Sequence, residues 1–515
     1  MLFMRATRWA SPRLTKNAGR SCRFPILPSR IQSRSCSSCD DSLGTPSKPG
    51  KPNRKGKALN PPNNDASDHR NIGIQQELFM NSIYSPGSPI LLPHGARIFN
   101  RLAEFLRKQY VQYGFQEVIT PTIYKKALWA KSGHLENYAD DMYTVTSTSP
   151  SRVAEEELEN NEQDEYGLKP MNCPGHCLIF AAKKHSYREL PIRYADFSPL
   201  HRNEVSGALT GLTRVRRFHQ DDGHIFCRPS QIESEIRQTL DFIRVAYGVF
   251  RLGPYRLALS TRPEQYMGSL EDWEQAEESL RRALNMSGQE WTVKEGDGAF
   301  YGPKIDVIVK DADGKEHQTA TIQLDFQLPK RFELEYTAPA PELEQRGKTT
   351  LDPDLLAVKG PVRPVLIHRA VLGSVERLMA LLMEQYRGNW PFWLNPRQAI
   401  LLTVNDTAPI VEFARKTQQI LLGAKPGEDG TVQASNMFVD VDESPRSVNA
   451  KLREARQKGY GMIMVVGDRE VETGTLTVDI RGIPEKQGQP RSPDQVQYTP
   501  EGMLELMKLK VESYE

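Results

Sequence analysis

The 515-residue sequence has no apolar stretch long enough to cross a membrane, and it lacks the common nucleotide-binding signatures. Its longest apolar runs, such as Leu378–Met383 and Met462–Val466, are far shorter than the roughly 18 residues that a membrane helix needs. A P-loop, a Rossmann fingerprint and a zinc-finger pattern are all missing. These absences exclude insertion into a membrane and leave function to residues that are separated along the chain.

Cysteine is scarce, with six in the chain. Half of them lie before residue 40, which leaves Cys173, Cys177 and Cys227 for the body of the protein. Three thiols in a body of this size do not make a disulfide framework. A reducing compartment, with one or more thiols free to bind a metal, is the better interpretation.

Acidic and basic residues nearly balance, with 67 Lys and Arg against 65 Asp and Glu. The first 39 residues contain eight of the basic residues and none of the acidic ones, so the remainder has a net charge of −6. Overall charge therefore does not attract nucleic acid. Any RNA binding must rest on local basic patches.

The basic N-terminal segment is rich in Arg and Ser and contains the apolar residues Leu2, Phe3, Met4 and Trp9. This composition is typical of a mitochondrial transit peptide, and the lack of an apolar h-region excludes a secretory signal. We expect a transit peptide over residues 1–45, with a basic disordered tail as the alternative. Residues 46–74 are rich in Pro, Gly, Asn and Lys and are predicted to form a disordered linker.

Residues 75–390 show the pattern of an antiparallel sheet with flanking helices. Apolar residues at helical spacing predict a helix over Ala96–Gln112, and a strand is predicted over Phe115–Thr120. Short strand-like runs joined by polar turns follow, at Arg193–Phe197, Ile305–Val309 and Thr319–Phe326. Such strands, without regular helical crossovers, favour an antiparallel sheet. Polar insertions are expected at about 147–165 and 338–358.

Residues 395–515 have a different pattern. Strands and helices are predicted to alternate, in the order Ala399–Val404, Ala408–Leu422, Met437–Val441, Arg446–Lys458 and Gly461–Val466, with a closing strand at Thr475–Ile480. This alternation is typical of a small α/β domain with a mostly parallel sheet. The fold class expected for the whole chain is α+β, an antiparallel-sheet domain followed by a smaller α/β domain.

Two segments in the first domain are dense in residues that bind metals or anions. In Lys169–His176, Cys173 stands between two prolines on a constrained loop, although a buried apolar cysteine is an equally good interpretation. In Phe197–Phe226, two antiparallel strands joined by a turn would aim Arg202 and Arg214 into one cleft, where guanidinium groups hold phosphate oxygens. Salt bridges of these arginines with nearby acidic residues, Glu204 and Asp222, are the alternative.

A third segment, Pro364–Arg377, is predicted as a buried strand that ends at His368 and a helix that begins near Ala370. Gly373 leaves room for the close approach of a planar ligand, and Arg377 lies one turn further along. An ordinary helix with a surface arginine is the alternative interpretation.

Together these segments resemble the signature motifs of class II aminoacyl-tRNA synthetases, and of the threonyl-tRNA synthetase family in particular. The matching motifs stand in the family's order: KPMNCPGH (Lys169–His176), HRNE (His201–Glu204), GLTRVRRFHQDDGHIF (Gly211–Phe226), GAFYGPKID (Gly298–Asp306), QLDF (Gln323–Phe326) and HRAVLGSVER (His368–Arg377). The resemblance extends from about Gln75 to the C-terminus and omits the two insertions.

The resemblance implies one Zn²⁺ per subunit, held by Cys173, His224 and His368. Three protein ligands leave a fourth position open, whereas structural zinc sites close all four. In the family, the metal takes the amino group and the hydroxyl of threonine, which rejects valine because valine has no oxygen to offer. Other His and Cys residues in these segments are expected to be neighbours of the site or core residues: His176, Cys177, His201, His219 and Cys227.

The resemblance also assigns the substrate sites. Asp222 is expected to bind the threonine hydroxyl, and the pocket is completed by Met171, Tyr301, Gln323 and Lys304. ATP, together with Mg²⁺, is expected to contact Arg202, Glu204, Arg214, Gln318 and Arg377. Arg202 would hold the α-phosphate and Arg377 the far phosphates, so these two arginines are the expected catalytic residues. Both nucleophiles come from substrates, so the chemistry needs positioning and charge stabilisation.

The C-terminal domain resembles the anticodon-binding domain shared by threonyl, prolyl, glycyl and histidyl enzymes. Contacts with tRNA are expected from Arg446, Lys451, Arg453 and Glu470, with a solvated helix face as the alternative. Asp479 departs from the family, where bacterial relatives tend to have a basic residue. Bacterial-type relatives also carry an N-terminal editing module, for which residues 1–74 leave no room, so we expect no such module in this chain.

The expected function is that of a threonine–tRNA ligase of the mitochondrial matrix, which forms threonyl-adenylate from L-threonine and ATP and transfers the threonyl group to tRNA(Thr). A homodimer is expected, through the helix at 96–112 and the strand that ends at Pro121. The alternatives are a non-catalytic, synthetase-like RNA-binding protein and a ligase for another amino acid of the subclass. The presence of Arg202, Arg214 and Arg377 disfavours the first, and the Cys/His/His set disfavours the second.

Overall fold

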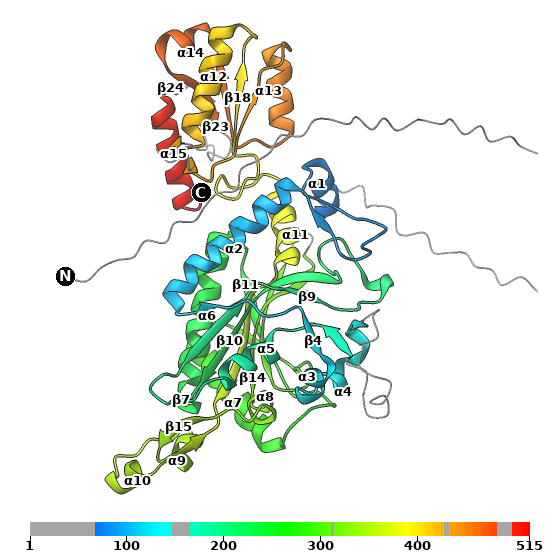
Figure 1. The fold of residues 1–515 in the computed structure, drawn as a ribbon, viewed down its shortest axis with the longest axis vertical. Coiled ribbons are helices and arrows are strands. Elements are labelled where there is room, and N and C mark those ends of the chain that lie inside the picture. Colours follow the sequence, from blue (N-terminus) through cyan, green and yellow to red (C-terminus); the bar gives the residue numbers. More distant parts are fainter. Residues whose placement is uncertain are drawn as a thin grey trace, which may run out of the picture. The chain divides into compact units, whose positions relative to one another are not determined.

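The computed structural model describes residues 67–146, 165–310, 314–423, 425–426, 432–433, 435–480 and 497–515 (Figure 1). The predicted transit peptide and nearly all of the insertion at 147–165 lie outside these ranges. Helix α1 (His69–Gln75) begins inside the range predicted as a linker, with the side chain of Asp68 accepting a hydrogen bond from the backbone N–H of Arg70. The linker prediction is therefore wrong at its C-terminal end, where His69 and Ile72 are buried.

The first domain is built on a nine-stranded sheet, as the antiparallel pattern predicts. Its strands run in the order β12 (Trp291–Lys294), β11 (Tyr255–Ser260), β13 (Lys304–Lys310), β14 (Glu316–Asp325), β17 (Val365–Ser374), β10 (Arg217–Cys227), β8 (Ile192–Asp196) and β3 (Gln116–Glu117), and β9 (Pro199–His201) also pairs with β10. The pairs β11–β12 and β3–β8 are parallel and the others are antiparallel. The α+β prediction is confirmed.

Helices share one hydrophobic core with this sheet. They are α2 (Pro93–Tyr113), α6 (Ile232–Val249), α7 (Leu270–Ser287) and α11 (Val375–Tyr386). The apolar face predicted for α2 is the buried one, with Ile98, Leu102 and Phe105 in the core. This helix ends at Gly114, whose φ of 69° is the left-handed conformation that glycine adopts easily.

Side-chain alternation along the central strands creates the two faces of the sheet. Ile225 of β10, Leu324 of β14 and Ile367 of β17 all belong to the core shared with the helices. Because successive residues of a strand point to opposite faces, their sequence neighbours His224, Gln323 and His368 face the other side. Phe226 and Leu366, on that same side, pack in an apolar cluster with residues of α5 (Cys173–Ala181) and α8 (Gln327–Arg331). The segment of the chain before α5 forms a small sheet of β4 (Ile123–Lys125), β6 (Tyr166–Leu168) and β5 (Thr144–Val145), together with the helices α3 (Lys126–Lys131) and α4 (His134–Tyr138).

Strand β17 corrects the prediction of a helix from Ala370. The strand continues to Ser374 because it lies between β10 and β14, where Ala370 pairs with Asp222 on one side and Thr321 on the other. A Cβ on Gly373 would lie 2.3 Å from the carbonyl oxygen of Thr319, so only glycine fits there. Helix α11 then begins at Val375, with the Ser374 side chain accepting a hydrogen bond from the N–H of Arg377.

The polar insertion predicted at 338–358 is a folded appendage. It contains β15 (Tyr336–Pro339), α9 (Pro341–Gln345), α10 (Pro353–Ala357) and β16 (Lys359–Val362), and β15 also pairs with β7 (His185–Ser186). The buried carboxylate of Glu344 accepts hydrogen bonds from the Arg228 guanidinium, at 2.5 and 2.6 Å, and from the Tyr336 hydroxyl at 2.8 Å. This buried acid ties the appendage to the residue that follows β10, a contact between residues more than 100 positions apart.

The C-terminal domain has a five-stranded sheet in the order β21 (Val439–Asp442), β18 (Ala399–Thr403), β22 (Met462–Val466), β23 (Leu476–Ile480) and β24 (Gln497–Tyr498). Its first three strands are parallel to one another, as predicted, whereas β23 runs antiparallel to both of its neighbours, β22 and β24. Helices α12 (Ala408–Leu421) and α13 (Val448–Gln457) stand where they were predicted, and α14 (Asp468–Thr473) and α15 (Pro500–Glu512) were missed. Among the described helices of both domains, none has the length and apolar character to span a bilayer.

Candidate active site

The structure brings Cys173, His224 and His368 together, with their ligand atoms all within 4.8 Å of one another. Cys173 is the first residue of α5, whereas the two histidines are paired directly across β10 and β17. The Nε2 atom of His224 lies 3.0 Å from the Nδ1 atom of His368, so both imidazoles point at the same spot. All three side chains are buried, and a thiol with two imidazole nitrogens is a donor set that suits zinc.

Burial controls the protonation of two of these groups. Desolvation lowers the pKa of His224 well below its usual value, which keeps its imidazole neutral, as a metal ligand must be. Desolvation also raises the pKa of the Cys173 thiol well above its usual value, and the nearby Asp222 carboxylate adds to this effect. A thiolate at this position therefore needs a cation beside it.

Asp325 orients one of the candidate ligands, a role that the sequence did not reveal. Its carboxylate lies 2.9 Å from Nε2 of His368 and also accepts hydrogen bonds from the N–H groups of Gln327 at 2.6 Å and Leu328 at 3.1 Å. An acceptor at Nε2 places the proton there and leaves the lone pair of Nδ1 directed toward His224 and Cys173. This carboxylate–histidine pair is the usual support of a metal-bound imidazole. The QLDF motif, at the end of the strand predicted over Thr319–Phe326, was the only sign of it in the sequence.

The other nearby His and Cys residues occupy supporting or core positions, as expected. The ring of His176 packs edge-on against that of His224, with centroids 4.6 Å apart. His219 is bound to Glu376, with Nδ1 2.8 Å from Oε1. Cys177 and Cys227 are free thiols in the core.

Three of the residues predicted to bind threonine, Asp222, Tyr301 and Gln323, lie beside the Cys/His/His group or next to a residue that does. Asp222 accepts a hydrogen bond from the Asn172 amide at 3.1 Å and lies 4.0 Å from Nε2 of His224. The Tyr301 ring packs on His368 with centroids 5.1 Å apart, and its hydroxyl donates to the Gln323 carbonyl.

Met171 and Lys304 make different contacts. The sulfur of Met171 lies 3.1 Å from Nε2 of the buried His134, and Met171 packs against the apolar cluster that contains Cys173. The ammonium group of Lys304 is 2.7 Å from the Asp306 carboxylate and 3.3 Å from Asp297. The charge of Lys304 is thus already neutralised, which makes it the least suited of the predicted pocket residues to bind a carboxylate.

A cleft of about 250 Å³, the arginine cleft, brings together the residues predicted to bind ATP. It is lined by Arg202, Glu204, Arg214, Gln318, Gln323 and Arg377, together with residues of β10, β14 and β17. The buried Nε of Arg202 has no hydrogen-bond acceptor within the described part of the chain, and its guanidinium group lies 5.0 Å from the centre of the Phe218 ring. An Arg that packs on an aromatic ring without an anionic partner is prepared to receive one from a ligand.

The remaining two arginines are anchored at the edges of this cleft. Arg214 lines the cleft and also forms a salt bridge of 2.7 Å with the Glu204 carboxylate. Both interpretations of the sequence therefore apply to Arg214, with Glu204 rather than Asp222 as its acidic partner. Arg377 donates to the carbonyl oxygens of Thr213 at 3.1 Å and Gln318 at 3.2 Å. Burial, together with the charges of Arg202 and Arg214, lowers the pKa of Arg377. Three guanidinium groups that repel one another form a site for a polyanion.

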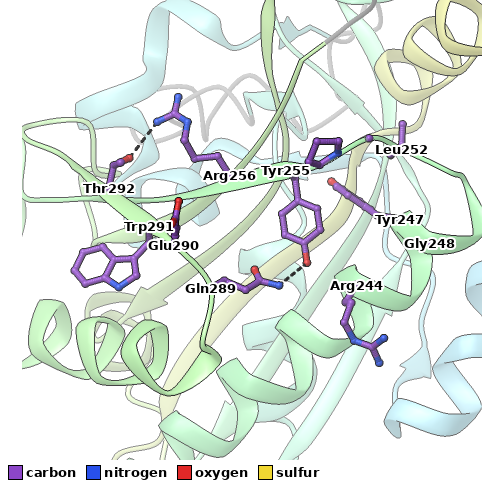
Figure 2. Close-up of a pocket in the computed structure, with 12 residues that line it drawn as sticks. Arg244, Tyr247, Gly248, Leu252, Tyr255, Arg256, Gln289, Glu290, Trp291 and Thr292 are labelled. Carbon is purple, nitrogen blue, oxygen red and sulfur yellow. Dashed lines mark hydrogen bonds between the residues drawn. The ribbon is translucent and has the colours of Figure 1, made fainter.

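A larger and more open cavity, of about 920 Å³, lies elsewhere in the first domain, between α6, β11 and β12 (Figure 2). Its arginines already have partners, since Arg256 is 2.8 Å from Glu316 and Arg244 is 2.7 Å from Asp241. Gln289 donates to the Tyr255 hydroxyl at 3.1 Å across it. It shares no lining residue with the arginine cleft and contains none of the predicted site residues.

In the C-terminal domain the predicted tRNA contacts separate into two groups. Lys451 is buried, and its ammonium group donates to the carbonyl oxygens of Thr403 at 2.8 Å and Asp442 at 3.1 Å. The prediction that it contacts tRNA from the surface is therefore wrong, because helical spacing turns this lysine toward the sheet. Arg453 and Arg446 are both exposed, and Arg446 is paired with Asp442 at 2.8 Å.

Glu470 also has an internal role. It is buried, and its carboxylate accepts hydrogen bonds from the N–H of Gly467 at 2.9 Å and from the Thr477 hydroxyl at 2.8 Å. Glu470 thus caps the start of α14.

Comparison with known proteins gives matches over both domains. Residues 155–386 match the class II core domain of tRNA synthetases (G, H, P, S and T), and residues 398–495 match the anticodon binding domain. The chain is 49% identical over 429 residues to a Schizosaccharomyces pombe protein named "Probable threonine–tRNA ligase, mitochondrial", which covers 83% of this chain and 87% of that protein.

Two further comparisons agree. "Threonine–tRNA ligase, mitochondrial 1" of Arabidopsis thaliana is 48% identical over 414 residues, or 80% of this chain, which spans only 52% of the length of that relative. The crystal structure of the RNA binding domain of a threonyl-tRNA synthetase from Cryptosporidium parvum is similar with a TM-score of 0.72 and 42% identity, covering 87% of this chain and 98% of that one.

Proposed function

The chain belongs to the threonyl-tRNA synthetase family, and from this premise we propose that it joins L-threonine to tRNA(Thr) at the expense of ATP, with Cys173, His224 and His368 as the ligands of a zinc ion. The observation that carries the proposal is the junction of two sites. Gln323 lines the arginine cleft and accepts a hydrogen bond from Tyr301, which packs on His368. The Cys/His/His group and the anion site are thus neighbours, as an amino acid and the α-phosphate of ATP must be when they react.

The side chains of the cleft position ATP and offset charge. Arg202, whose buried Nε is unpaired within the described residues, binds the α-phosphate and the threonine carboxylate. Arg214 and Arg377 bind the β- and γ-phosphates of ATP, which class II enzymes bind together with Mg²⁺. Glu204 and Gln318 complete the nucleotide site. Because charge grows on the α-phosphate as the carboxylate attacks it, fixed guanidinium groups stabilise the transition state more than the ground state.

Threonine is recognised beside the candidate ligands. A zinc ion held by Cys173, His224 and His368 would supply a Lewis-acidic centre for the amino group and the hydroxyl of the substrate. Asp222, held by the Asn172 amide, accepts the hydrogen bond of the threonine hydroxyl. Tyr301 and Met171 close the pocket around the methyl group. An apolar pocket alone would separate threonine from valine only about a hundredfold.

The proposal predicts strict dependence of ATP–pyrophosphate exchange on threonine. Because a site built around a hydroxyl rejects a substrate that lacks it, we expect valine to support exchange with a kcat/KM about 10⁴-fold lower. The substitution Asp222→Ala should raise the KM for threonine roughly 10- to 100-fold, since it removes a charged hydrogen bond worth about 1.5–3 kcal/mol. The KM for ATP serves as the internal control and should stay unchanged. Exchange supported equally by valine and threonine would exclude this recognition mechanism.

We further propose that the C-terminal domain binds the anticodon region of tRNA(Thr). The exposed residues Arg453 and Arg446 are the contacts retained from the predicted set. Lys451 and Glu470 support the surface from within, through their bonds to Thr403 and Gly467. Local basic side chains must supply this binding, because the body of the protein is mildly acidic.

Localisation in the mitochondrial matrix is proposed from the Arg- and Ser-rich composition of residues 1–45. We expect these residues, fused to a fluorescent protein, to direct it into mitochondria with loss of the segment by cleavage. A matched fusion in which Arg5, Arg8 and Arg13 are replaced by Gln should stay outside, because import of such segments depends on positive charge. Diffuse fluorescence of the unaltered fusion would contradict the assignment.

A homodimer is proposed through the surface formed by the end of α2 and the segment after β3. Val111 is 85% exposed and Ile119 is 89% exposed, which leaves two β-branched apolar side chains in water on this surface. A second copy of the chain would cover them.

A further inference from the structure

Helix α1, which precedes the sheet, carries a buried histidine that contacts two segments from which residues of the arginine cleft come. The Nδ1 atom of His69 lies 2.7 Å from the Glu384 carboxylate in α11, and its Nε2 accepts a hydrogen bond of 3.2 Å from the backbone N–H of Leu212. His69 is 4% exposed and Leu212 is fully buried, so the bond between them is shielded from water, whereas the Glu384 carboxylate is partly exposed. The imidazole of His69 thus connects helix α11 with a turn, and each of them is more than 140 residues away from His69 in the sequence.

The hydrogen-bond pattern determines the tautomer of His69. A backbone N–H can only donate, so Nε2 must be the unprotonated nitrogen. The proton is therefore on Nδ1, where it is donated to Glu384. Asp68, His69 and Glu384 are close enough to resemble a metal site, but both nitrogens of His69 are engaged, which leaves no lone pair for a metal.

The turn that His69 holds carries residues of the nucleotide site. Leu212 precedes Thr213, whose carbonyl oxygen accepts a hydrogen bond from Arg377, and Arg214, which lines the cleft. The turn approaches the imidazole so closely that a Cβ on Gly211 would lie 2.1 Å from Nε2. Gly211 also has a φ of +46°, so the backbone there is shaped to the ring.

We propose that His69 is a positioning residue for ATP, which holds the turn 211–214 against α11 through the acceptor at Nε2 and so places Arg214 in the cleft. The inference rests on the proposed ligase activity but adds a residue outside the family motifs quoted above. Glu384 orients the ring, and Leu212 N–H is the group that the ring holds. Loss of the acceptor should let the turn move and weaken the binding of ATP, without affecting the threonine pocket.

Two isosteric variants test this directly in threonine-dependent ATP–pyrophosphate exchange. The amide oxygen of His69→Gln can replace Nε2 as an acceptor, whereas the shorter His69→Asn can replace only Nδ1 as a donor. We expect His69→Asn to raise the KM for ATP roughly five- to tenfold, the equivalent of one lost hydrogen bond, and His69→Gln to stay within about twofold of the unaltered protein. The KM for threonine and the zinc content should be unchanged in both.

A double-mutant cycle with Arg214→Ala completes the test. If His69 acts through the turn that carries Arg214, the effects of His69→Asn and Arg214→Ala on the KM for ATP should be clearly less than additive. A purely structural role would instead lower the melting temperature and kcat of both His69 variants alike, with the KM for ATP unchanged, and would overturn the inference. Additive effects would overturn it as well. Threonine-dependent exchange by the unaltered protein tests the ligase function separately.

Discussion

Replacing Cys173 with alanine should remove bound zinc and lower threonine-dependent ATP–pyrophosphate exchange by more than roughly 100-fold. Loss of a group that only supports a metal ligand costs about 10- to 100-fold in affinity or activity, and loss of a ligand itself should cost more. His224 and His368 would remain, but two imidazoles alone do not hold the metal in a buried site. Zinc content by elemental analysis and exchange kinetics, measured on the same preparation, check both parts of this expectation.

Cys177 provides a matched control within the same helix. It lies one turn after Cys173 in α5 and is equally a buried free thiol, but it does not belong to the Cys/His/His group. We expect Cys177→Ala to lose some stability through the small cavity that it leaves, and to keep its zinc and its threonine activation. A metal-free Cys173→Ala protein with full activity would show that zinc has no role in the reaction.

Arg202→Ala should reduce exchange by about 10²–10³-fold, the usual cost of removing one preorganised group that stabilises developing charge. The effect should fall mainly on kcat, because the α-phosphate gains its charge in the transition state. Arg202→Lys should recover only part of the rate, since an ammonium group retains the charge but loses the planar fork that binds two oxygens at once. Stopped assays of pyrophosphate exchange at saturating ATP and threonine measure the change.

Arg244→Ala is the control for this experiment. Arg244 lines the larger cavity of Figure 2, is bound to Asp241 and shares no pocket with the predicted site residues. Its removal should leave exchange within about twofold, as for an exposed ion pair of small energetic value. If Arg244→Ala were as inactive as Arg202→Ala, the larger cavity rather than the arginine cleft would be the place of reaction.

Local patterns in the sequence predicted the helices and strands in which the regular spacing of apolar residues marks the buried face. The apolar stripe of α2 and the alternation of β18, α12, β21, α13 and β22 are examples, because one face of each element repeats with its own period. The same reasoning failed at Ala370, where Asp222 and Thr321 on the adjacent strands extend β17 beyond the predicted helix start. It also failed at Lys451, whose position in a basic stretch gave no sign that its ammonium group is buried against Thr403.

The sequence by itself determined which chemical groups the protein has and the order in which they stand, and this was enough for the family resemblance. Only the tertiary structure decided that Cys173, His224 and His368 meet, although 51 and 144 residues separate them in turn. It also decided that Asp325 orients His368 and that His69 reaches Leu212. The physical reason is that strand pairing and burial bring distant residues together through the whole core, whereas a pattern along the chain reports only the preferences of neighbouring residues.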